Sequence, residues 1–166
     1  VGGPQFTHVA AHEAGIVLRN ALFRWPARID LEAAPRVVYT HPQLAEVGLS
    51  ELEARTLYRN VRVLRAPFAG NDRAQTERDT DGLVKVVVTS HGRILGAGIV
   101  GAGAGDLIQT WVLAIARRLN IKAVATMIAP YPTRGEANKR AAGEYFAPKL
   151  FSGTVRRIVR LLSHLP

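Results

Sequence analysis

The sequence predicts an α+β fold, in which helices pack on an antiparallel β-sheet. Residues 83–89 and 94–100 are apolar runs of strand length, and the short polar stretch between them predicts a hairpin turn. Strand patterns also precede this hairpin, whereas helical patterns follow it towards the C-terminus. This order is typical of an antiparallel sheet that carries its helices to one side.

The individual elements follow from local signals. Strands are predicted over residues 36–39, 61–68, 83–89 and 94–100. Helices are predicted over residues 7–23, 50–58, 103–120, 122–128 and 133–146, and residues 70–81 predict a loop with a helical turn. Pro26 stops the first helix, and Ser50 with Glu53 forms a capping-box pattern. Asp106 is expected to cap the helix over residues 103–120.

Three parts are expected along the chain. Residues 1–30 hold the first helix and part of a connector, and residues 31–148 hold the sheet with its helices. Residues 149–166 predict a basic amphipathic helix whose polar side carries Arg156, Arg157 and Arg160. We expect this helix to pack on the domain rather than to bind a membrane surface.

The composition excludes several classes of function. The chain has 166 residues, with 22 Lys and Arg against 13 Asp and Glu, but the positive charges are scattered and no nucleic-acid-binding motif accompanies them. Cysteine is absent, which excludes disulfides, thiolate metal sites and a redox dithiol within this chain. The lack of cysteine fits a cytoplasmic location, and no stretch is long and apolar enough to span a membrane.

Two patterns that resemble ligand sites are rejected on their context. Gly96, Gly98 and Gly101 match the dinucleotide pattern GxGxxG, but they lie within a predicted strand and no acidic residue follows at the required spacing. We expect these glycines to allow close helix packing instead. His8 and His12 are four residues apart on one helix, but a third ligand is missing, so no metal site is predicted.

A proline-rich corner at residues 129–135 leads directly into a predicted helix. Pro132 and Thr133 suit a helix start, and Glu136 follows Thr133 at the spacing of a capping box. The corner therefore fixes where Tyr131 points and places a carboxylate close behind it. On spacing alone, both a structural tyrosine and a phenol presented to another surface remain open.

This corner resembles the C-terminal active-site motif of the pyridine nucleotide–disulfide oxidoreductases, most of which carry His-Pro-Thr followed three residues later by Glu. Tyr131 stands where the histidine would be, with Pro132, Thr133 and Glu136 in register. Tyrosine at this place, with Lys139 after the glutamate, looks most like the mercuric reductase branch. Further stretches resemble the family in the same order, at residues 2–10, 38–49, 92–97 and 101–108.

The resemblance implies the dimerisation domain of a homodimeric flavoenzyme that uses FAD and NAD(P)H. The redox dithiol and the flavin and nicotinamide domains would lie elsewhere in the parent chain. Tyr131 and Glu136 of one subunit would complete the active site of the other, and the Tyr131-Pro132 bond would be cis. A helix N-terminus with free N–H groups would border the flavin, at residues Thr7, His8, Val9 and Ala10.

The same resemblance sets expectations for the chain by itself. It begins at Val1 within a family motif, so we read it as a piece of a longer protein or as a processed protein. Most walls of the flavin pocket would then be missing. We therefore expect the piece alone to bind no FAD and to be inactive.

The electron acceptor stays open at this point. Imidazole titrates near neutrality and shuttles protons, whereas a phenol, with a pKa of about 10, is a poor base at pH 7. Tyr131 therefore favours a metal ion or another acceptor over dihydrolipoamide or glutathione. Mercuric reductases commonly end in a cysteine pair, which this chain lacks, and that departure counts against mercury. The alternatives are a dihydrolipoamide dehydrogenase-like enzyme and a non-enzymatic dimerising module.

Overall fold

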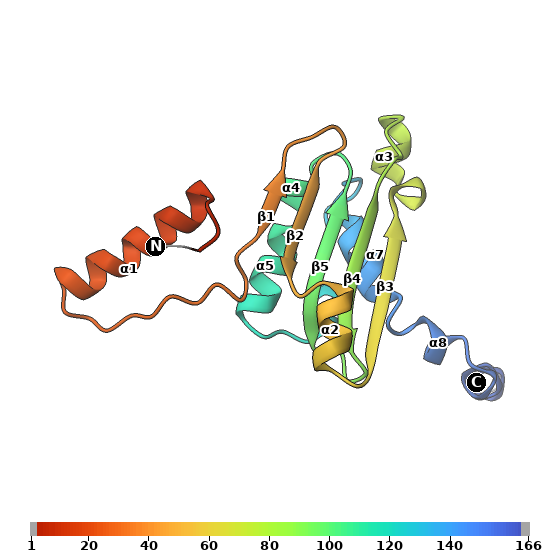
Figure 1. Cartoon of the computed structure of the whole chain (residues 1–166). Helices are drawn as coiled ribbons and strands as arrows, with labels where there is room; N and C mark the ends of the chain where they lie inside the picture. The colour runs from red at the N-terminus through yellow and green to blue at the C-terminus, as the bar shows by residue number, and fades with distance from the viewer. Residues whose placement is uncertain (1–2, 164–166) are drawn as a thin grey trace.

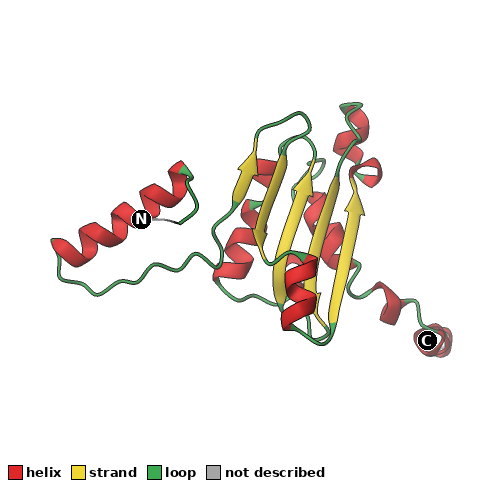
Figure 2. Cartoon of the chain, viewed as in Figure 1, coloured by secondary structure: helices red, strands yellow, loops and turns green. Residues whose placement is uncertain are grey.

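The computed structural model describes residues 3–163 and contains an antiparallel sheet with helices on both faces (Figure 1). This architecture confirms the predicted α+β fold (Figure 2). The five strands have the order β1-β2-β5-β4-β3 across the sheet. Their bounds are β1 (Arg36–Val38), β2 (Leu44–Gly48), β3 (Val61–Pro67), β4 (Leu83–Thr89) and β5 (Ile94–Val100).

The helices lie mostly within the predicted segments. Their bounds are α1 (Thr7–Ala21), α2 (Glu51–Leu57), α3 (Asp72–Thr76), α4 (Ala104–Leu107), α5 (Gln109–Ala116), α6 (Ile121–Ala125), α7 (Glu136–Gly143), α8 (Ala147–Leu150) and α9 (Gly153–Leu162). A 3-10 turn, Phe68–Gly70, precedes α3. Within residues 3–163, no helix has the length and apolar character that crossing a membrane requires.

The sheet separates a large core from a small one. Side chains alternate along β4, so Val84, Val86 and Val88 face the large core while Val87 faces the other side. Trp111 of α5 is fully buried in the large core. Helices α4, α5 and α7 cover this face, whereas α2 covers the small core from the opposite face (Figure 1).

Local signals at two helix starts had different outcomes. The capping box is confirmed, since the Glu53 backbone N–H donates to Ser50 Oγ at 3.2 Å and the Ser50 N–H donates to Glu53 Oε2 at 2.8 Å. The predicted cap at Asp106 is wrong. Gly103 occupies the N-cap of α4 with a φ of 70°, and Asp106 lies inside the first turn. The predicted helix over residues 103–120 is also interrupted at Ile108, between α4 and α5.

The structure differs from the sequence prediction in one additional strand and in the role of one glycine. Strand β2 was not predicted, although Ala45 and Val47 are buried between more exposed neighbours as in a half-buried strand. The expectation that helices approach the β5 glycines closely is wrong for Gly96. A Cβ there would overlap the backbone of Leu49, in the turn before α2. Gly96 therefore allows backbone, rather than a helix, to approach the sheet.

The tail has two short helices in place of one. Helix α8 spans the predicted boundary between residues 148 and 149, and the basic amphipathic helix α9 begins only at Gly153. Phe151, Val159 and Leu162 are more than half exposed in this chain. The last residues of the predicted tail helix, 164–166, lie outside the described part of the chain.

Candidate functional site

The corner between α6 and α7 presents Tyr131 at the surface, with 71% of the residue exposed. The Tyr131-Pro132 peptide bond is cis, which confirms the prediction. A second cis bond, His41-Pro42, was not predicted. Helix α7 begins at Glu136 rather than at Thr133, so the corner is longer than the sequence indicated.

Thr133 stabilises the corner itself instead of capping α7. Its hydroxyl donates to the Pro130 carbonyl oxygen at 2.7 Å. Gly135 occupies the N-cap position, and no side chain caps the helix there. The predicted capping box of Thr133 and Glu136 is therefore wrong, because the hydroxyl it needs is bonded within the turn.

Asn71 joins the corner to α3. Its side chain is nearly inaccessible, with only 4% of the residue exposed. The Asn71 Nδ2 donates to the Thr133 carbonyl oxygen at 2.9 Å, and its Oδ1 accepts from the Ala74 backbone N–H at 3.0 Å. One buried amide thus caps α3 and holds the corner at the same time.

Arg134 fastens the corner to the segment that follows α3. Its Nε donates to Glu77 Oε2 at 2.9 Å, and its Nη2 donates to Asp79 Oδ2 at 3.0 Å. Only 14% of the Arg134 side chain is exposed, and its guanidinium lies over the ring of Phe68. The hydrogen bond from Arg134 lowers the pKa of Glu77, which is the direction expected for a charge-assisted pair.

A buried polar contact holds α7 beneath the corner. Trp111 Nε1 donates to Asn138 Oδ1 at 2.9 Å, and Asn138 Nδ2 donates to the Leu107 carbonyl oxygen at 2.9 Å. Trp111 is 0% exposed and Asn138 is 1% exposed. The amide therefore pairs polar groups that would otherwise be buried without partners, and it ties α7 to α4 and α5.

The Tyr131 hydroxyl donates to Asp72 Oδ2 at 2.9 Å. This hydrogen bond raises the pKa of Tyr131, and the negative charges of Asp72 and, more weakly, Glu136 act in the same direction. Sequence reasoning missed Asp72, because it lies 59 positions from Tyr131 in a segment that was expected to be mostly loop. The signal for it was absent from the local sequence.

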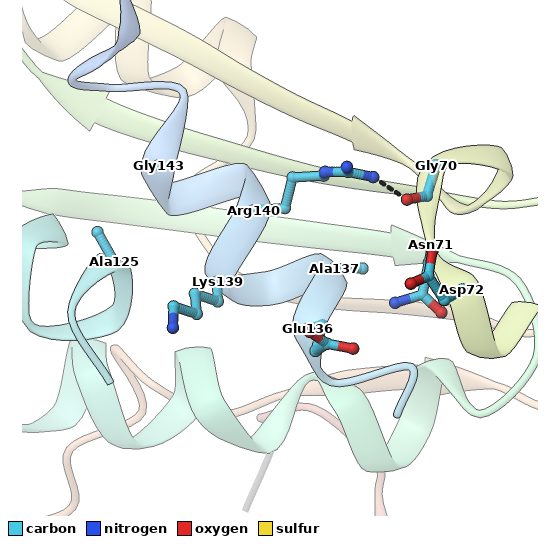
Figure 3. Close-up of a pocket in the computed structure, with 9 residues that line it drawn as sticks. All are labelled: Gly70, Asn71, Asp72, Ala125, Glu136, Ala137, Lys139, Arg140 and Gly143. Atoms are coloured by element: carbon cyan, nitrogen blue, oxygen red, sulfur yellow. Dashed lines mark hydrogen bonds between the residues drawn. The ribbon is translucent and has the colours of Figure 1, made fainter. Parts of the chain in front are cut away.

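Glu136 lies on the first turn of α7 and lines a hollow of about 370 Å³ beside the corner (Figure 3). Asp72, Lys139 and Arg140 line the same hollow. Arg140 reaches across it and donates to the Gly70 carbonyl oxygen. The structure thus brings Tyr131 and Glu136 to one corner, but the hydroxyl of Tyr131 binds Asp72 and not Glu136.

The four residues predicted to border the flavin lie on two different sides of α1. Helix α1 begins at Thr7 without a side-chain cap, and Thr7 and Ala10 border a surface hollow. His8 Nε2 instead lies 2.8 Å from the Pro35 carbonyl oxygen, and Val9 is 3% exposed. The Val9 backbone N–H donates to the Phe6 carbonyl oxygen at 3.0 Å, so of these two residues only His8 can offer a ligand a backbone N–H.

Nothing in the described chain adds a metal site. Among residues 3–163, no three His, Asp or Glu side chains cluster as metal ligands do. His8 and His12 both line a largely apolar cavity between α1 and α5.

The helix start and the tyrosine corner lie at opposite edges of the sheet. Helix α1 precedes the edge strand β1, whereas the corner contacts α3, which follows the other edge strand, β3 (Figure 1). Within one chain, the sheet therefore keeps Thr7 and Tyr131 apart.

Comparison with protein families identifies the sheet and the corner. Residues 34–142 match the family model described as the pyridine nucleotide-disulphide oxidoreductase dimerisation domain. The chain belongs to this family. The matched segment takes in the whole sheet and the corner, so both belong to the dimerisation domain of a family that uses FAD and NAD(P)H.

Related proteins divide between two branches of the family. The chain is 40% identical over 141 residues to a mercuric reductase of Staphylococcus aureus, covering 84% of this chain and 26% of that protein. It is 38% identical over 142 residues to the mitochondrial dihydrolipoyl dehydrogenase of Sus scrofa, covering 85% and 28%. The chain thus spans about a quarter of the length of these relatives.

A solved structure has the same fold. The Cu(II) complex of the HOCl-induced flavoprotein disulfide reductase RclA from Escherichia coli superposes with a TM-score of 0.79 at 26% identity. The match covers 86% of this chain and 33% of that one. The structural resemblance therefore extends over most of this chain.

Proposed function

We propose that this chain is the dimerisation domain of a homodimeric, flavin-dependent NAD(P)H oxidoreductase, and that Tyr131 and Glu136 of one subunit complete the active site of the other. In the parent enzyme, FAD and the nicotinamide supply the electrons. The observation that carries the proposal is the position of Tyr131, which is exposed on a corner of a dimerisation domain and donates its hydroxyl hydrogen to Asp72.

The separation within one chain supports action across a dimer. The corner that carries Tyr131 is fixed at one sheet edge by the contacts of Asn71 and Arg134, and the flavin-bordering helix start lies beyond the other edge. A second subunit would bring another helix start towards the corner.

We accordingly assign residues 1–30 to the flavin-binding domain and its connector, residues 31–148 to dimerisation, and residues 149–166 to a basic tail. We also expect the parent enzyme to be cytoplasmic.

The start of α1 fits the edge of a flavin pocket. The first turn carries no side-chain cap, and the Val9 and Ala10 N–H groups donate to the Phe6 carbonyl oxygen. The helix start can therefore offer an electron-rich ring the N–H groups of Thr7 and His8 and the positive end of the helix dipole. Thr7 and Ala10 border the hollow at this end, the His8 side chain lies against the Pro35 carbonyl oxygen, and the Val9 side chain is buried. These residues would orient the flavin, and the remaining walls belong to the rest of the parent chain.

The chemistry of Tyr131 favours a metal-ion acceptor, as in the mercuric reductase branch. Its raised pKa keeps the phenol protonated at pH 7, so it cannot take a proton from a dihydrolipoamide thiol as an imidazole does. A phenol oxygen can still contact a metal ion or its thiolate complex. The Cu(II) complex of RclA makes Cu(II) a second acceptor worth testing.

A dihydrolipoamide dehydrogenase-like activity is the second candidate. It is supported by the 38% identity to the pig enzyme, which is close to the 40% found for the mercuric reductase. A dimerising module without activity of its own is the third. The three differ in what the full-length protein reduces.

The test is an acceptor comparison with the full-length protein and NADH or NADPH. Each reduced nicotinamide can reduce one Hg(II), two Cu(II) or one disulfide. We expect thiol-bound Hg(II) or Cu(II) to give a higher kcat/KM than lipoamide or glutathione disulfide. In Tyr131→His, we expect the preference to move towards lipoamide, because the imidazole restores a base. Faster turnover of lipoamide by the wild type would contradict the metal-ion assignment, and turnover of none of the four would favour the module.

A further inference from the structure

Asp72 is the one side chain that receives the Tyr131 hydroxyl in the described structure, at 2.9 Å. The contact is not an isolated pair of mobile surface side chains. Asp72 opens α3, and the neighbouring Asn71 both caps α3 and binds the Thr133 carbonyl of the corner. Carboxylate and phenol are therefore carried by two segments that a buried amide fixes to each other.

Two of the cations near Asp72 are engaged elsewhere. Arg134 pairs with Glu77 and Asp79, and Arg140 donates to the Gly70 carbonyl. Among the described residues, no lysine or arginine forms an ion pair with Asp72. Lys139, which lines the same hollow, forms no ion pair with Asp72 either, so the Asp72 carboxylate oxygen accepts the Tyr131 hydroxyl without a competing ion pair in the described part of the chain.

The direction of the hydrogen bond determines what Tyr131 can offer. A tyrosine hydroxyl has one hydrogen and acceptor lone pairs. Its hydrogen goes to Asp72, so the lone pairs of the phenol oxygen are what remains for a molecule approaching from outside. Such an oxygen suits a cation or a hydrogen-bond donor, and it suits an anion poorly.

We propose that Asp72 is a positioning residue: it takes the hydroxyl hydrogen of Tyr131, fixes the ring, and makes Tyr131 present oxygen lone pairs to the electron acceptor. This inference rests on the proposed function of Tyr131. It adds that the corner selects acceptors that are cations or hydrogen-bond donors. Asp72 acts through Tyr131 and does not itself touch the acceptor.

The test uses Asp72→Asn in the full-length protein. The amide keeps the shape of the side chain, loses the charge and can donate to the phenol oxygen. The titration of Tyr131 is followed by NMR of protein labelled with carbon-13 at tyrosine Cζ, with the resonance assigned by its loss in Tyr131→Phe. We expect the pKa of Tyr131 to fall towards the ordinary value in Asp72→Asn, because a phenolate is no longer opposed by a carboxylate. Asp106→Asn, on α4, is the matched control and should leave the titration unchanged.

Kinetic measurements separate the effect of Asp72 on Tyr131 from the role of Tyr131 in turnover. With thiol-bound Hg(II) as acceptor, Asp72→Asn should lower kcat/KM roughly tenfold, and it should have no further effect in a Tyr131→Phe background, since coupled residues are not additive. An unchanged Tyr131 pKa in Asp72→Asn would overturn the role of Asp72 while leaving the function of Tyr131 standing. A lowered pKa with unchanged turnover in both Asp72→Asn and Tyr131→Phe would instead overturn the proposed function of the corner.

Discussion

Replacing Tyr131 with phenylalanine in the full-length enzyme is expected to lower kcat/KM roughly tenfold to a hundredfold, or about 1.4–2.7 kcal/mol of transition-state stabilisation. The substitution keeps the ring and removes only the hydroxyl that contacts Asp72 and, on our proposal, the acceptor. The cis corner and its contacts through Thr133 and Arg134 do not involve that hydroxyl. Steady-state kinetics with the preferred acceptor measure the effect.

Two variants define the specificity of this result. Tyr39→Phe removes the hydroxyl of another tyrosine, which is 78% exposed, and should leave kcat/KM unchanged. Glu136→Gln should give a smaller loss than Tyr131→Phe, because Glu136 influences the phenol by its charge and not by a hydrogen bond. Flavin content and stability should match the wild type in all three variants. Wild-type kinetics in Tyr131→Phe would make Tyr131 a structural residue.

Asn138→Ala is expected to destabilise the domain by about 1–3 kcal/mol for each buried group left without a partner. Trp111 Nε1 and the Leu107 carbonyl oxygen both lose their hydrogen bonds to the Asn138 side chain. The loss is large because these groups lie in the core and water does not replace the amide. Unfolding in urea, followed by circular dichroism, measures the change.

Asn20 provides a matched control for this substitution. Its side chain also makes two hydrogen bonds, to the backbone N–H and carbonyl of Ala27, but both are exposed. Asn20→Ala should therefore cost much less, since water can satisfy the groups that are freed. Equal losses of unfolding free energy in the two variants would show that the buried hydrogen bonds of Asn138 do not stabilise the domain more than exposed ones.

The sequence predicted the elements whose signals are local. The strands β3, β4 and β5 appear where apolar runs and a turn indicated them, and the Ser50–Glu53 capping box forms as its spacing suggested. Strand β2 was missed because a five-residue strand next to the cis His41-Pro42 turn gives too short an alternation to stand out.

The site was predictable only in part. The family resemblance pointed to Tyr131 and Glu136, and the structure places both at the corner. The capping box predicted for Thr133 failed because its hydroxyl has a nearer acceptor in Pro130. Asn71 and Asp72 contact the corner, and Arg134 of the corner contacts Asp79, across 55 to 62 positions of sequence. No periodicity or spacing in the sequence records such contacts.

The claim that Tyr131 acts in the partner's active site is tested most directly with mixed dimers. One defect is Tyr131→Phe; the other replaces the redox cysteines that the family resemblance places in the flavin domain. When the two defects are on different subunits, the intact dithiol of one subunit faces the intact Tyr131 of the other, and we expect about half of the wild-type activity. When both defects are on one subunit, the single intact dithiol faces Phe at position 131, and activity should drop to about half that of the Tyr131→Phe enzyme. The opposite pattern, with activity retained only when both defects share a subunit, would show that Tyr131 serves its own chain and would contradict the account.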